Sequence, residues 1–115
     1  MGIDINLDWE QNKKISLYDK DISHIHARFS DDESEILHEL FPIKYWKYDG
    51  ELEFKFKSNG FKKAVILGLH CLNKYKNDSD EFTYFLNWID GVIKFYIFGF
   101  ELNEKGIKTK ISISG

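Results

Sequence analysis

Cysteine and proline are almost absent from this chain, with one of each among 115 residues. The lone Cys71 cannot form an internal disulfide, so a reducing compartment is sufficient and the cytoplasm is the expected location. One proline and eight glycines leave little room for disordered linkers. We expect a single globular domain over residues 1–115, without a tail or a second domain. The chain does not start with basic residues followed by a short apolar run, so we expect no signal peptide.

Long uncharged apolar runs are missing as well. The most hydrophobic stretch, FTYFLNWIDGVIKFYIFGF at residues 82–100, is interrupted by Asn87, Asp90 and Lys94. A spanning helix needs about 20 mainly apolar residues, so we expect no membrane span. A basic stripe is also lacking, because the 16 lysines and arginines are scattered and the net charge is −3. Binding to nucleic acid is therefore not expected.

Alternating apolar and polar residues predict strands in the first half of the chain. IDINLDW at residues 3–9 alternates without a break, and KKISLYD and ISHIHARF continue the pattern at residues 13–19 and 22–29. Residues 31–40 are predicted as a helix, because Ser30 and Glu33 form a capping box and a proline follows. Asp49-Gly50 then predicts a hairpin between IKYWKY and ELEFKFK.

The second half predicts one helix, a second hairpin and a last strand. Residues 61–75 repeat apolar side chains at helical spacing, after Ser58 or Asn59 as cap, and are expected to lie on a sheet. Asp90-Gly91 predicts a hairpin inside residues 82–100. Its strands are apolar on both faces, which places them at the centre of a sheet, one face covered by the 61–75 helix and the other by more chain or by a partner. IKTKISI at residues 107–113 predicts an edge strand with outward lysines.

The expected fold class is therefore α+β. It consists of a mostly antiparallel sheet of seven or eight strands, including two Asp-Gly hairpins, with two helices packed on it.

Groups that could carry catalysis are sparse, and no catalytic motif of recognised spacing occurs. His24 and His26 point the same way as Arg28 on a strand, and two co-facial imidazoles can share a metal or act as acid and base. A metal site needs a third ligand, and none stands at a diagnostic spacing. His70 and Cys71 diverge by about 100° on a helix, so they do not form a nucleophile and base pair. We therefore expect no enzyme activity and no cofactor.

An acidic stripe is predicted on the first helix, where Asp31, Asp32, Glu35 and Glu39 fall within a sector of about 100°. One interpretation is a solvated face whose first acids interact with the helix dipole. The alternative is a set of carboxylates that imitate phosphates and enter a basic cleft.

The first hairpin predicts a second patch. Inward placement of its apolar residues turns Trp46 and Tyr48 outward beside Glu51 and Glu53, unless another element covers Trp46. Outward aromatic residues among acids are typical of binding hot spots.

Small size, acidity, aromatic richness and the lack of catalytic groups combine here with the acidic DDESEILHE helix and the YWKYDGELE hairpin. In these respects the chain resembles the immunity proteins of bacterial polymorphic-toxin and contact-dependent growth inhibition systems. The resemblance implies a protein that binds a cognate toxin domain, such as a nuclease, and covers its active site or an essential surface.

Two alternatives to that function stay open. One is a small metal-binding or hydrolytic enzyme that uses His24 and His26, and the other is a self-associating assembly subunit. The expected inhibitor is a monomer or a weak homodimer. The residues expected to bind the partner are Asp31, Asp32, Glu35, Glu39, Trp46, Tyr48, Glu51 and Glu53.

Overall fold

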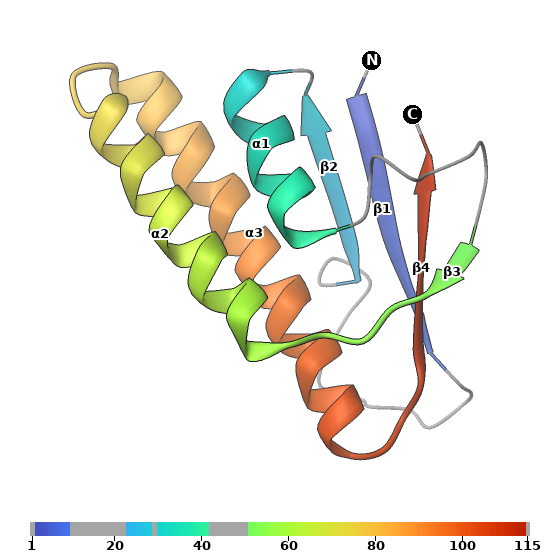
Figure 1. Ribbon diagram of the computed structural model, residues 1–115. Helices are drawn as coiled ribbons and strands as arrows, with labels where there is room; N and C mark the ends of the chain where they lie inside the picture. The colour runs from blue at the N-terminus through green and yellow to red at the C-terminus, as the bar shows by residue number, and fades with distance from the viewer. Residues whose placement is uncertain (1, 10–22, 29, 42–50, 115) are drawn as a thin grey trace.

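The computed structural model describes residues 2–9, 23–28, 30–41 and 51–114. In this part of the chain, four strands form one antiparallel sheet and three helices lie on one side of it (Figure 1). The elements in chain order are β1 (Gly2–Trp9), β2 (His24–Arg28), α1 (Asp31–Leu40), β3 (Glu51–Glu53), α2 (Ser58–Lys74), α3 (Ser79–Glu104) and β4 (Thr109–Ser114). The α+β class is confirmed. The predicted sheet of seven or eight strands with two helices is wrong.

The strands follow the alternation in the sequence, and their order is β2-β1-β4-β3. Ile5 and Leu7 of β1 are buried under the helices, whereas Asn6 and Asp8 next to them are exposed. β4 pairs with β1 on one side and with β3 on the other, so the predicted edge position is wrong. The outward side chain of Lys110 in β4 indicates which face of the sheet is open and not which strands are neighbours.

Ser30 caps the start of α1 as predicted, but the reciprocal bond of the capping box is not formed, because the Ser30 N–H donates to the Arg28 carbonyl and the Glu33 carboxylate binds Arg28 and the Ser30 hydroxyl. The backbone N–H of Glu33 donates to Ser30 Oγ over 3.3 Å, and the acids at the helix start lie where the helix dipole favours them. Ile36, Leu37 and Leu40 are buried on the opposite side of the helix. This burial fixes the orientation of the predicted acidic stripe.

α3 replaces the predicted second hairpin and is a single helix of 26 residues. Asp78 caps its start, because its side chain accepts a hydrogen bond from the N–H of Glu81. The buried residues recur at helical spacing: Phe85, Trp88, Ile89, Val92, Phe95, Tyr96, Phe98, Gly99 and Leu102. An Asp-Gly pair predicts a turn only where the flanking segments pair as strands. Here the apolar period of α3 outweighs the cost of Gly91, which is about 1 kcal/mol in a helix interior.

α2 is the helix predicted at residues 61–75, but it begins earlier and packs differently. Its N-cap is Lys57, which makes no side-chain capping bond, so the prediction of Ser58 or Asn59 as cap is wrong. α2 packs on α1 and α3 and not on the sheet. A Cβ on Gly68 would come within 2.7 Å of Ile89 Cγ1, so the glycine permits this close contact with α3.

Several predictions fall outside the described residues. These are the strand at residues 13–19, the first strand of the Asp49-Gly50 hairpin, and the side chains of Trp46 and Tyr48. Of the second hairpin strand, β3 keeps only Glu51–Glu53. The chain then turns inward, and Phe56 becomes a core residue against Gly99 of α3. Within the described ranges, no helix is long and apolar enough to cross a membrane.

Candidate partner-binding site

The face of the sheet opposite the helices is polar. It presents Asp4, Asn6 and Asp8 from β1, His24 and His26 from β2, Lys110 and Ser112 from β4, and Glu51 and Glu53 from β3. This follows from the period of two in each strand, because every neighbour of these residues turns its side chain toward the helices. Glu51 and Glu53, which were predicted to bind the partner, therefore lie on an exposed surface where side chains are regularly spaced.

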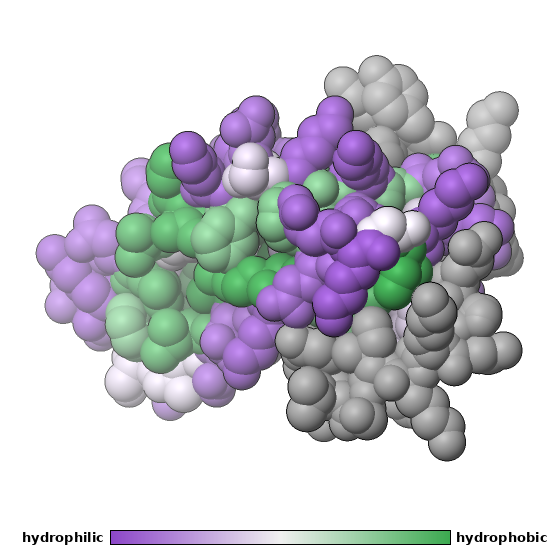
Figure 2. Space-filling view, turned by 90° about the horizontal axis from the view of Figure 1, so that it is seen from below, coloured by the Kyte–Doolittle hydropathy of each residue, from purple (hydrophilic) through white to green (hydrophobic). Residues whose placement is uncertain are grey.

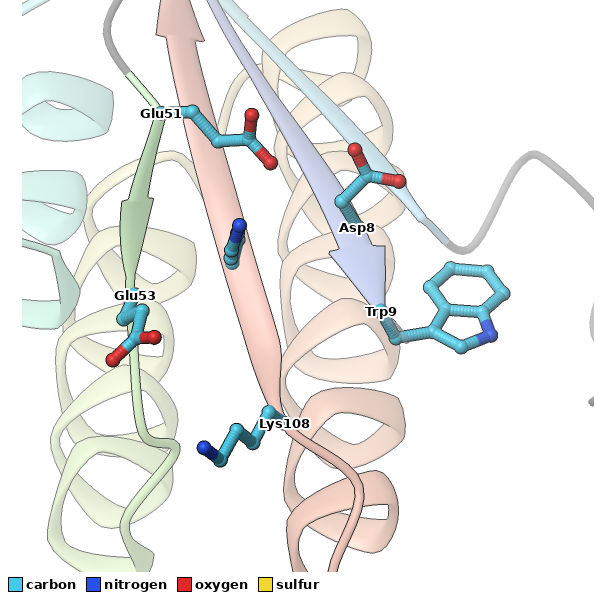
Figure 3. A pocket seen from close by; sticks show the side chains of 6 residues that line it. Asp8, Trp9, Glu51, Glu53 and Lys108 are labelled. Carbon is cyan, nitrogen blue, oxygen red and sulfur yellow. The ribbon is translucent and has the colours of Figure 1, made fainter. Parts of the chain in front are cut away.

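One hollow of about 350 Å³ opens at the β3 end of this face (Figure 3). It is lined by Asp8, Trp9, Glu51, Glu53, Lys108 and Lys110. In Figure 3 the carboxylates of Glu51 and Asp8 come from strands on the two sides of β4. The register places Lys110 of β4 opposite Asp8 on one side and Glu53 on the other. We call this group of six residues the sheet-face hollow.

Charges of the sheet-face hollow are not paired with one another. Among the described residues, no ion pair within 4.0 Å involves Asp8, Glu51, Glu53, Lys108 or Lys110. Three carboxylates and two ammonium groups are thus displayed on one side of the sheet without pairing to one another. Such a pattern discriminates between partners, because a mismatched partner brings like charges together.

His24 and His26 share the open face but converge on one carboxylate. His26 Nδ1 lies 2.8 Å from Asp4 Oδ1, and His24 Nε2 lies 3.2 Å from the same oxygen. His24 Nδ1 also lies 2.7 Å from Asn6 Oδ1. Across the residues that the structure describes, no group of three or more His, Cys, Asp or Glu side chains is arranged to hold a metal. The imidazoles are therefore held as part of the polar face.

Arg28 does not join the histidines and instead fastens three elements together. Its Nε donates to Glu33 Oε2 over 2.9 Å, and its two terminal nitrogens donate to the Glu81 carboxylate over 3.2 and 3.3 Å. Its guanidinium carbon lies 3.7 Å from the ring centroid of Tyr84. These contacts, those to Glu81 first, raise the pKa of Arg28. The cluster joins the end of β2 to the starts of α1 and α3.

Glu33 at the centre of that cluster is completely buried. Besides Arg28, the Ser30 hydroxyl donates to its carboxylate over 2.9 Å and the Tyr84 hydroxyl over 3.3 Å. A buried carboxylate is tolerated only when paired and hydrogen-bonded in this way. The role of this side chain is structural, and the capping box was the only signal of it in the sequence.

The acidic stripe of α1 is partly neutralised by α2. Lys74 Nζ lies 3.1 Å from Asp32 Oδ2, and Lys63 Nζ lies 3.4 Å from Glu39 Oε2. The Tyr75 hydroxyl also donates to Asp32. That bond and then Lys74 hold the pKa of Asp32 below its usual value, while Asp32 raises the pKa of Tyr75 to about 12.

The remaining stripe residues, Asp31 and Glu35, are exposed. Glu39 and Glu53 meet at a second hollow, of about 390 Å³, between the end of α1, the start of α2 and β3. Lys55, Lys57 and Lys63 also line it, so this junction is not acidic. The acids of α1 and of β3 therefore share this hollow only through Glu39 and Glu53.

Sequence reasoning missed Asp8, Lys108 and Lys110 as members of a site. Their outward position was readable from the alternation of the first and last predicted strands, but the pairing of β4 between β1 and β3 was not. Comparisons with protein families, with curated proteins and with solved structures found no match to this chain.

Proposed function

We propose that this chain is an immunity-type inhibitor that binds and neutralises a cognate toxin domain by protein–protein contact. The observation that carries the proposal is the sheet-face hollow, where charges of both signs are held on a rigid surface without pairing to one another. A partner with basic groups opposite Asp8, Glu51 and Glu53, and acidic groups opposite the two lysines, satisfies all of them. Partners of another pattern are rejected by like-charge contacts.

The proposal accounts for cognate specificity in physical terms. An antiparallel sheet fixes the backbone positions from which these side chains project, so little backbone ordering is needed on binding. A basic nuclease surface is attracted to the carboxylates from a distance, which raises the association rate at low ionic strength. The exposed α1 acids, Asp31 and Glu35, contribute to the same attraction without direct contact with the hollow.

The test is coexpression with the toxin domain encoded by the adjacent reading frame, followed by binding kinetics at several ionic strengths. The wild-type chain should protect the cells. Reversing Glu51 and Glu53 together to lysine should lower the association rate about tenfold or more and weaken its salt dependence. Reversing Asp80 and Glu104, two exposed acids of α3, is the control, because it changes the net charge by the same amount.

Reversal of Asp31 and Glu35 forms a third arm and measures the contribution of α1. The proposal fails if the wild-type chain neither binds nor protects. The assignment to the sheet-face hollow fails if the Glu51 and Glu53 variant behaves like the α3 control while the α1 variant loses binding.

A further inference from the structure

An apolar stripe covers the outer side of the α2 and α3 pair. Four large hydrophobic side chains are exposed in the described part of the chain, and all of them belong to these two helices: Ile66 at 65%, Leu69 at 61%, Leu86 at 44% and Ile97 at 38%. Figure 2, which views the molecule from below, shows hydrophobic residues gathered together on this face with hydrophilic residues around them. Exposed clusters of this kind mark interaction surfaces.

The geometry of the helices makes the stripe continuous. At 100° per residue, Phe61, Leu69 and Leu72 fall within about 80° on α2, and Leu86, Ile97 and Phe100 fall within about 60° on α3. We call these six residues the α2/α3 stripe; Ile66 lies about 60° beyond Leu69 on α2 and is not part of it. The stripe is hollowed where the start of α2 lies beside the C-terminal half of α3. An apolar cavity of about 230 Å³ opens there and is lined by Ser58, Phe61, Tyr96, Ile97 and Phe100.

The two helices differ in charge. α2 carries lysines and no aspartate or glutamate, whereas α3 carries five acidic residues and a single lysine. On the outer surface, Lys62 borders the stripe on the α2 side. On the α3 side Asp90 and Glu101 border it together with Lys94, whose Nζ lies 2.9 Å from Asp90 Oδ2. The α2 rim therefore has a net positive charge, and the α3 rim has a net negative one.

We propose that a second copy of this chain covers the α2/α3 stripe, with a two-fold axis that runs parallel to the helices. This axis lays α2 of one copy over α3 of the other and brings the rim of net positive charge to the rim of net negative charge. The perpendicular axis would lay α2 on α2 and α3 on α3, so like charges would meet. The α3 carboxylates and the net charge of −3 also disfavour an anionic membrane as the occupant.

The levels of the helices identify the residues that meet. Gly60 lies beside Tyr96, and Gly68 lies beside Ile89. Rotation about an axis parallel to the helices keeps these levels, so Leu69 of one copy faces Leu86 of the other. Phe61 of one copy lies over the apolar cavity of the other. Four helices then form an antiparallel bundle with the stripe at its centre.

Sedimentation velocity at protein concentrations from about 1 to 200 µM tests the proposal, because a small isologous interface is expected to dissociate in this range. Wild-type protein should shift from monomer to dimer. Leu69→Lys alone and Leu86→Glu alone should each weaken the dimer at least about tenfold, because a charge replaces a side chain buried on association. His70→Lys and Asn87→Glu are the matched controls, since these exposed neighbours face away from the stripe.

Mixing the two stripe variants, Leu69→Lys and Leu86→Glu, distinguishes the two axes. In the proposed arrangement, a heterodimer sets the introduced lysine against the introduced glutamate on one side and the two unchanged leucines against each other on the other side. The mixture should therefore dimerise where each variant alone does not. A wild-type chain that stays monomeric at about 200 µM overturns the proposal. Dimers that the stripe variants leave intact, or a mixture that fails to associate, also overturn it. None of these outcomes depends on a toxin.

Discussion

Glu33 shows how much of this fold depends on one buried charge. Replacing it by glutamine removes the charge that faces Arg28 and leaves the hydrogen bonds from Ser30 and Tyr84 weaker. We expect Glu33→Gln to lower the free energy of unfolding by about 1–3 kcal/mol, because the hydrogen bonds to a buried carboxylate become weaker bonds to a neutral amide. Arg28 keeps its pair with Glu81 in this variant. Urea denaturation measures this change.

Glu35→Gln is the matched control for Glu33→Gln, since Glu35 is exposed on the same helix. It should change stability by less than about 0.5 kcal/mol. If the two variants are equally stable, Glu33 contributes no more than a surface acid, and the joint of β2, α1 and α3 is held by apolar packing alone.

Tyr75 gives stability a dependence on alkaline pH. Its pKa is raised from 10.0 to about 12, so between these values the folded chain keeps a proton that the unfolded chain loses. Stability from the bond to Asp32 is therefore complete below pH 10 and decreases as the pH rises toward 12. Tyr75→Phe should destabilise the chain by about 1–2 kcal/mol at about pH 7, since it removes a hydrogen bond to a charged group.

The difference in stability between wild type and Tyr75→Phe should then become smaller from about pH 10 to about pH 12, as measured by urea denaturation at each pH. In an Asp32→Asn background the tyrosine substitution should have little effect at any of these pH values. A difference that stays constant across the range contradicts the role of Asp32 as the acceptor that holds the Tyr75 proton.

Within α3, two glycines should respond in opposite ways to alanine. Gly91 lies in the helix interior, and a Cβ there meets nothing within 4 Å. Gly91→Ala should therefore raise the free energy of unfolding by about 0.5–1 kcal/mol. At Gly99 the added Cβ would overlap the Phe56 ring in the core, so Gly99→Ala should destabilise by about 1–3 kcal/mol.

This pair of substitutions also discriminates between the helix and the hairpin predicted at Asp90-Gly91. A type I′ turn needs a positive φ at its glycine, and alanine there would be unfavourable. Thermal unfolding of Gly91→Ala thus gives opposite shifts of Tm for the two structures, and a lower Tm than wild type would contradict α3.

Elements that bury only one face could be predicted from the sequence, whereas an element that is buried on most sides could not. β1, β2, α1 and β4 each bury one face, and their patterns were interpreted correctly. α3 is buried over more than half its circumference, so its apolar residues fit both a period of two and a period of 3.6. The Asp-Gly pair then favoured the wrong period, although Asp78 as cap and the Asp90–Lys94 pair at i, i+4 indicated a helix.

The candidate site was predictable to a smaller extent, because it is assembled by strand order. Glu51 and Glu53 were recognised as outward residues, but their neighbours on the open face come from β1 and β4, distant in the chain. The α1 stripe was correctly placed on one face of its helix. Its pairing with Lys63 and Lys74 depends on how α2 lies against α1, which no local pattern specifies.

At the scale of the whole molecule, the two proposed surfaces lie on opposite sides. The sheet-face hollow belongs to the uncovered face of the sheet, whereas the α2/α3 stripe faces away from the sheet across the helix layer (Figure 1). A dimer formed through the stripe therefore leaves the sheet-face hollow of each copy exposed. The two surfaces should act independently, because no residue belongs to both.

A dimer of this kind should bind two toxin domains. Light scattering after size exclusion, at concentrations where the wild-type chain is dimeric, should give a complex of two inhibitors and two toxins. Leu69→Lys should give a complex of one and one with the same affinity per site, since the substitution is far from the hollow. A dimer that binds one toxin, or a Leu69→Lys variant that loses toxin binding, would mean that the toxin reaches the helices. In that case the exposed leucines, and not the charges of the sheet, form the inhibitory surface.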